Sequence, residues 1–170
     1  MINFTRIAKA EFEKVLAESI EYQNSDVLAA SEVIKNMALI SFTRSAKSSS
    51  LYFSLSHVLS TSIVGLHILN AMRCRDGLVR PAQIINLMAS VLFCNIGVIR
   101  GILNEDNGDH QKIDNEKPRF IDQSFTDSSL WPYKSFRSTK FIQEISFLDS
   151  SINYELVSRA MEYSDFFGKA

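Results

Sequence analysis

The stretch LFCNIGVIRG, residues 92–101, ends a long apolar segment and carries more information about the fold than any other part of the chain. The apolar residues around it predict a helix over residues 82–103. Gly97 and Gly101 indicate close backbone packing near the end of that helix. Cys94 and Asn95 lie at the same helix end, in a place where a reactive pair of side chains would be presented. The stretch therefore predicts a buried helix whose end carries a candidate functional pair.

Helical spacing of apolar residues predicts further helices on both sides of this stretch. They cover residues 5–22, 25–39, 51–72, 137–147 and 152–166. Residues 104–130 are polar and rich in turn-forming types, which predicts a long surface insertion, with a small hairpin expected within 111–121. We therefore expect an all-α bundle, one domain over residues 1–170, with N-terminal helices in 1–48 and a helical core in 50–166.

The composition is that of an ordinary soluble domain. The 170 residues are 46% hydrophobic and 22% charged, with a formal net charge of −1. This balance gives no overall attraction to nucleic acid. The two cysteines, Cys74 and Cys94, form no CxxC pattern, which argues against a disulfide framework or a zinc site built on thiolates. Charged residues near the N-terminus argue against a signal peptide. We expect a reduced, cytoplasmic setting.

Two stretches, residues 48–72 and 81–99, contain no charged residue and are long enough to cross a bilayer. Serine, threonine and histidine interrupt the first, and Gln83, Asn86 and Asn95 interrupt the second. Helices buried within a soluble bundle have the same character. We prefer that interpretation and expect no membrane insertion, while a membrane-embedded helical hairpin stays the alternative.

His57 is a further candidate residue that accompanies the Cys94–Asn95 pair. It lies in an otherwise apolar segment 37 residues before Cys94. This arrangement resembles the HD-domain metal-dependent phosphohydrolases, in which a His on one helix meets a His-Asp pair that ends a later helix. It is most similar to the bacterial branch whose signature reads approximately LLHDIGYVRG. The positions that match this signature are Leu92, Ile96, Gly97, Arg100 and Gly101.

Further segments are similar to the same branch, in the same order along the chain. Residues 64–69 are similar to its helix after the first His, and Gly108–Asp109 to a Gly-Asp that follows the signature. Residues 126–134 with Arg137 resemble a TDAxLTPYH…R segment. The resemblance covers about residues 50–165, and it implies an HD-domain-like helical bundle.

The departures from the family fall on its chemistry. In the family, the first His and the His-Asp pair hold a divalent metal that activates water to attack a phosphate ester. Here Cys94 replaces the His and Asn95 replaces the Asp, while Lys134 stands at the position of the PYH histidine. An Asn side chain is uncharged, and a thiol binds metal only as a thiolate. The resemblance therefore implies a catalytically degenerate protein without a resident cofactor, in which His57, Cys94, Asn95 and Asp127 occupy the vestigial metal-site positions.

Simpler roles remain open for each candidate residue. His57 is either a surviving metal ligand or a hydrogen-bonded core residue. Asn95 is expected to cap or hydrogen-bond the helix end, and Asp127 is either the last acidic ligand or the cap of the turn before Trp131. The basic residues form either an anion-binding cluster or ordinary solvated surface charge. They are Arg100, Lys134 and Arg137, with Lys140 beside them. The acidic run from Glu105 to Asp109 is interpreted as a solvated turn.

The preferred function is binding, as a regulatory or assembly factor that senses a small anionic, phosphorylated ligand. We expect the partner to be a second copy of the chain or another protein, and neither nucleic acid nor a membrane. The alternative is an active phosphohydrolase with an altered site, in which His57, Cys94 and Asp127 hold a divalent metal such as Mn, Fe or Zn.

Overall fold

The computed structural model describes residues 3–20, 25–50, 52–77, 79–107, 126–146 and 151–164. Within these ranges all regular secondary structure is helical, which confirms the all-α prediction. The α-helices are α1 (Phe4–Ser19), α2 (Ser25–Ser45), α3 (Leu55–Asp76), α4 (Pro81–Phe93), α5 (Lys134–Ser146) and α6 (Tyr154–Tyr163). Three short 3-10 helices accompany them: η1 (Ile96–Val98), η2 (Asn104–Asn107) and η3 (Asp127–Tyr133).

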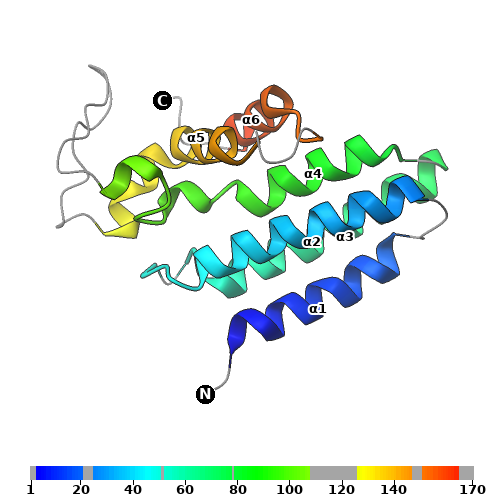
Figure 1. Cartoon of the computed structure of the whole chain (residues 1–170), viewed down its shortest axis with the longest axis horizontal. Coiled ribbons are helices and arrows are strands. Elements are labelled where there is room, and N and C mark those ends of the chain that lie inside the picture. Colours follow the sequence, from blue (N-terminus) through cyan, green and yellow to red (C-terminus); the bar gives the residue numbers. More distant parts are fainter. Residues whose placement is uncertain are drawn as a thin grey trace.

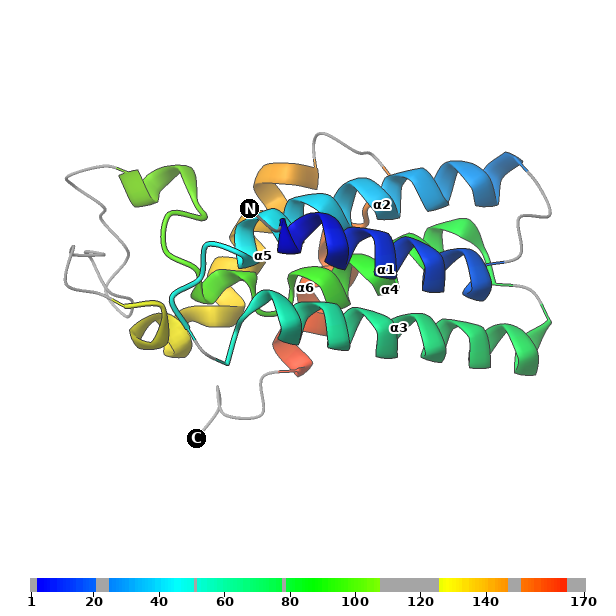
Figure 2. The same ribbon diagram turned by 90° about the horizontal axis from the view of Figure 1, so that it is seen from below.

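The helices α1 to α4 lie side by side with their long axes roughly aligned (Figures 1 and 2). The helix α1 packs on α2 and α3, and these two pack in turn on α4. The pair α5 and α6 packs together on the other side of α4, with α5 also covering η1. The helix α4 is thus central, and the turn that follows it lies between α5 and the ends of α2 and α3.

Large apolar side chains fill the spaces between these helices. Phe12 of α1 meets Phe42 of α2 edge to face, with 5.6 Å between ring centroids, and both are fully buried. Phe93, the last residue of α4, packs against Phe141 of α5 at 5.6 Å. The N-terminal helices therefore share one apolar core with the helices that carry the candidate site.

The structure corrects one helix boundary that matters for the site. The helix α4 ends at Phe93, whereas the sequence pattern predicts a helix that continues to residue 103. The chain turns at Cys94–Asn95, forms η1, and takes a positive φ of 73° at Gly101. Apolar residues continue through the turn because Ile96, Val98 and Ile99 are buried. Their periodicity reflects burial of the turn, and it does not extend the helix. The hairpin expected within 111–121 lies outside the described residues.

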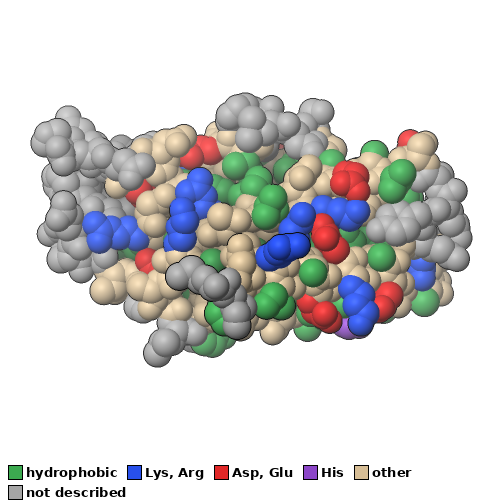
Figure 3. Space-filling view, turned by 60° about the horizontal axis from the view of Figure 1, so that its bottom comes forward, with side chains coloured by type: hydrophobic (Ala, Val, Ile, Leu, Met, Phe, Trp, Pro, Cys, Tyr) green, Lys and Arg blue, Asp and Glu red, His purple; other side chains and the backbone are tan. Residues whose placement is uncertain are grey.

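Two described helices are long and apolar enough to cross a membrane by length and composition alone: Leu55–Asp76 and Pro81–Val98 counted through the turn. Of the most apolar window in each, 28% is buried in the first and 56% in the second. The helix α3 exposes Val64 and Ile68. On the face of the molecule drawn in Figure 3, hydrophobic side chains are interspersed with charged ones. These features are weak support for a membrane segment.

Candidate functional site

The structure brings together two of the positions that the resemblance singles out. His57 lies in the first turn of α3, and Asn95 is the second residue after the end of α4. The Asn95 Nδ2 atom is 3.1 Å from the His57 Nε2 atom, although 38 residues separate them along the chain. The amide N–H donates to Nε2 when that nitrogen carries no proton. With the amide turned over, Oδ1 would accept from Nε2–H, so Nε2 is engaged in either orientation.

The surroundings of His57 favour its neutral form. Its ring contacts Tyr52 at 4.8 Å and Phe53 edge to face at 5.8 Å between centroids. Burial lowers the pKa of the His57 imidazole below its ordinary value of 6.5. A neutral ring that carries its proton on Nδ1 accepts from the Asn95 amide through Nε2. The two side chains thus satisfy one another.

Cys94 is held as a protonated thiol. Its Sγ atom donates to the Val91 carbonyl at 3.4 Å, one turn back in α4. Burial raises the pKa of the Cys94 thiol, and the nearby Lys134 ammonium only partly opposes this effect. A thiol with a raised pKa supplies little thiolate near neutral pH, and the thiolate is the form that ligates metal or attacks an electrophile.

The residues present do not fit the divalent metal that the resembled family uses. The imidazole nitrogen that faces the turn is engaged by an amide, Asn95 offers no anionic oxygen, and Cys94 favours its neutral thiol. Among the residues that the structure describes, no group of three or more His, Cys, Asp and Glu side chains could hold a metal ion.

Asp127 joins three segments of the chain. The residue is 4% exposed, and its Oδ2 atom accepts from the Ser48 hydroxyl at 2.8 Å and from the Ser49 backbone N–H at 2.7 Å. Its Oδ1 atom accepts from the Arg100 backbone N–H at 3.1 Å. Asp127 therefore ties the connection between α2 and α3 to the turn after α4. It does not cap η3, because the Thr126 side chain performs that role by accepting from the Ser129 N–H.

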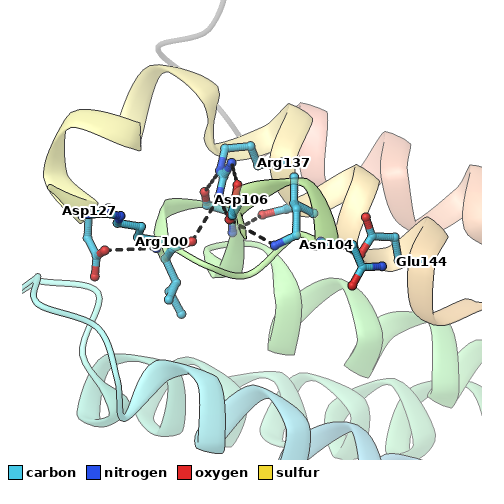
Figure 4. A network of polar contacts seen from close by, with 10 residues as sticks. Arg100, Asn104, Asp106, Asp127, Arg137 and Glu144 are labelled. Carbon is cyan, nitrogen blue, oxygen red and sulfur yellow. Dashed lines mark hydrogen bonds and ion pairs between the residues drawn. The ribbon is translucent and has the colours of Figure 1, made fainter. Parts of the chain in front are cut away.

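Arg137 and Asp106 form a buried ion pair, and Figure 4 shows how they face each other. The NH2 group lies 2.7 Å from Asp106 Oδ2 and the NH1 group 2.8 Å from Oδ1. The side chains of Arg137 and Asp106 are 3% and 0% exposed. The interpretation of Arg137 as solvated surface charge is wrong, and so is that of Asp106 as part of a solvated turn. The Arg137 guanidinium is committed to contacts within the chain.

The other two predicted cations lie in different settings. Arg100 is exposed, and its backbone is tied to Asp127. Lys134 is buried, with its ammonium 4.6 Å from the centre of the Trp131 ring. The Trp131 ring stacks on Phe53 at 4.9 Å, and Phe53 contacts His57. A continuous row of aromatic rings therefore runs from His57 to the cation at Lys134.

Gly97 makes the close approach that the sequence predicts. A Cβ atom at this position would overlap the Lys134 carbonyl oxygen and would lie 2.6 Å from the Ser138 backbone nitrogen. The Gly97 N–H donates to the Ser138 hydroxyl at 2.9 Å, and that hydroxyl donates to the Cys94 carbonyl at 3.2 Å. The turn and the first part of α5 are thus in direct backbone contact.

Sequence reasoning missed three residues that shape this site. Ser138 and Asp106 hold the turn from the far side, and Ser41 of α2 donates to the Leu92 carbonyl at 2.6 Å. Single serines in helical segments carry no signal of a distant backbone partner. Asp106 lies in an acidic run, whose usual interpretation is a solvated surface.

The fold and site define an all-α protein in which a His–Asn pair joins the start of one helix to the end of the next. The Npun_R2479-like family matches the chain over residues 2–169, and the chain belongs to that family. Neither a curated protein nor a solved structure matches the chain significantly.

Proposed function

We propose that this chain is a catalytically degenerate HD-domain-like protein that acts as a regulatory or assembly factor and senses a small anionic ligand. The observation that carries this proposal is the 3.1 Å contact between His57 Nε2 and Asn95 Nδ2. The contact joins two of the positions at which the resembled family holds its metal. It supports an HD-like frame in which the metal-binding donors have been replaced.

The chemistry of the pair supports loss of catalysis. A metal in such a site would need the lone pair of the imidazole and an anionic oxygen from the following helix end. Here an amide group engages the imidazole nitrogen, and the neighbouring thiol favours its neutral form. Loss of one residue that merely hydrogen-bonds to a metal ligand weakens metal affinity or activity by about 10- to 100-fold. Replacement of two adjacent ligands is expected to have a larger effect.

The proposed ligand is a small phosphorylated anion, bound beside the same turn. Lys134 contributes a buried ammonium at the end of the aromatic row, and Arg100 contributes a guanidinium at the surface of the turn. A buried cation interacts strongly with a phosphate because the local dielectric constant is low. Arg137 is not part of this proposal, because Asp106 and two carbonyl groups already engage it.

We expect the purified protein to contain no stoichiometric Mn, Fe, Zn or Mg and to hydrolyse no phosphate ester when these metals are supplied. Elemental analysis and a phosphatase assay test both statements. The alternative function is an active phosphohydrolase that uses His57, Cys94 and Asp127. Stoichiometric metal together with turnover that His57→Ala abolishes would establish the alternative and defeat the proposal.

Inorganic phosphate is expected to change the fluorescence of the protein in a saturable manner. The chain contains one tryptophan, and Trp131 lies 4.6 Å from the Lys134 ammonium, so its emission reports on binding there. The Lys134→Met variant is expected to lose the response. Lys9→Met is the matched control, because Lys9 pairs with Glu13 on the outer side of α1. An unchanged response in Lys134→Met would remove Lys134 from the proposed site.

The proposed setting is the cytoplasm, with a second copy of the chain or another protein as the partner. The near-neutral net charge of −1 supports the exclusion of nucleic acid from this proposal. The burial of Ile85, Met88 and Leu92 of α4 in the core supports leaving a membrane out of this proposal. A core helix of a soluble protein has the same length and composition as a membrane span.

A further inference from the structure

The turn after α4 has a specific need for hydrogen-bond donors from elsewhere in the chain. Carbonyl groups at the end of a helix have no donor within the helix, and a buried carbonyl without a donor is destabilising. Arg137 supplies two donors to the turn. Its Nε–H group donates to the Gly97 carbonyl at 2.7 Å, and its NH2 group donates to the Ile99 carbonyl at 3.1 Å. One side chain of α5 therefore fixes the backbone on both sides of Val98.

Asp106 holds Arg137 in this position from the opposite side. The carboxylate accepts hydrogen bonds from both terminal nitrogens of the guanidinium, and its Oδ2 atom also accepts from the Leu103 N–H at 3.1 Å. A planar guanidinium can serve two carbonyls and a carboxylate together, whereas an ammonium lacks this forked geometry. Both side chains are almost completely buried. Water therefore cannot replace either partner of the ion pair unless the turn rearranges.

We propose that Arg137 is the positioning residue of the candidate site, and that Asp106 acts through it to hold Asn95 against His57. This inference deepens the proposed function, on which it rests, because it names what sets the geometry of the same site. It assigns Arg137 a role within the turn in place of direct contact with an anion. It also links the position of η2 to the contact between α3 and the turn, through a single guanidinium (Figure 4).

The test is nuclear magnetic resonance of the full chain at pH 7.5, with the Asp106→Asn variant compared with the wild type. The readouts are the hydrogen exchange of the Asn95 side-chain amide and the nitrogen chemical shift of His57 Nε2. We expect the variant to stay folded, the Asn95 amide to exchange on the order of tenfold faster because its protection depends on the local contact, and the His57 shift to change. Asp76→Asn is the matched control, because Asp76 forms an exposed pair with Arg75 at the end of α3.

A second variant keeps the inference testable if Asp106→Asn does not fold. Arg137→Met combined with Asp106→Leu removes both buried charges and replaces them with apolar side chains, which usually preserves stability. The Gly97 and Ile99 carbonyls still lose their donors, so the Asn95 and His57 signals should change here as well. Unchanged signals in either folded variant would show that the ion pair stabilises the fold without positioning Asn95, and would overturn the inference. That result would leave the metal and phosphatase tests of the proposed function unaffected.

Discussion

Gly97→Ala is expected to lower the free energy of unfolding by about 3 kcal/mol, at the upper end of the usual range for overpacking. The added methyl group would overlap the Lys134 carbonyl oxygen and press on the Ser138 nitrogen, and both are backbone atoms of α5. Backbone atoms cannot rotate away as the end of a side chain can. Relief requires α5 to move away from the turn, which weakens the Ser138 and Arg137 hydrogen bonds together. Urea unfolding monitored by circular dichroism measures the effect.

Gly65→Ala provides the matched control for this prediction. Gly65 lies within α3, and the nearest atoms to an added Cβ atom would be those of the Val91 side chain, with its two methyl carbons at 3.1 Å. Alanine is also the better helix former by about 1 kcal/mol, which offsets the tighter contact. We expect a change in stability well below that of Gly97→Ala. Equal effects of the two substitutions would mean that the approach of the turn to α5 is not as close as the structure has it.

Arg137→Met is expected to destabilise the protein by about 3–5 kcal/mol, because it leaves the Asp106 carboxylate buried without its partner. The substitution also removes the donors of the Gly97 and Ile99 carbonyls. Chemical denaturation of the Arg137→Met variant, and of the double variant with Asp106→Leu, measures the loss in the free energy of unfolding. The double variant should regain much of the lost stability, because no isolated charge remains.

Arg159→Met is the control for the loss of an arginine at the surface. Arg159 pairs with Glu155 on α6, where both side chains are largely exposed, and such pairs contribute less than about 1 kcal/mol. A loss in Arg137→Met as small as that in Arg159→Met would contradict the burial of the Arg137–Asp106 pair.

The sequence alone was sufficient for the helical class and for the approximate positions of the helices. Apolar residues that recur at helical spacing mark α1, α2, α3 and α6, and these signals are local. The end of α4 was placed wrongly because the apolar pattern continues through Ile96, Val98 and Ile99. What ends the helix is a set of distant side chains. Ser138 and Arg137 bind backbone groups that lie about 40 residues earlier in the chain. The spacing of apolar residues along a segment cannot predict such distant contacts.

The candidate site was predictable where a motif marked it. His57 and the Cys94–Asn95 pair were chosen from their resemblance to a family pattern, and the structure places His57 and Asn95 in contact. The partners of the remaining residues were not predictable. Asp127 and Arg137 bind the turn, and Asp106 binds Arg137, through bonds that span between 27 and 40 residues. An isolated aspartate or arginine in a polar segment has the same sequence signature whether it is solvated or buried in an ion pair.

We propose that this chain keeps a metal-binding frame in which the donors have been replaced. The variant Cys94→His/Asn95→Asp/Lys134→Met restores the two ligand types of the resembled family and removes the ammonium whose charge acts on Cys94. Calorimetric titration of this folded variant with Mn²⁺, alongside the wild type, is the test of this proposal. We expect stoichiometric binding that appears only in the variant and disappears when His57→Ala is added. A folded variant that binds Mn²⁺ no more tightly than the wild type would contradict it.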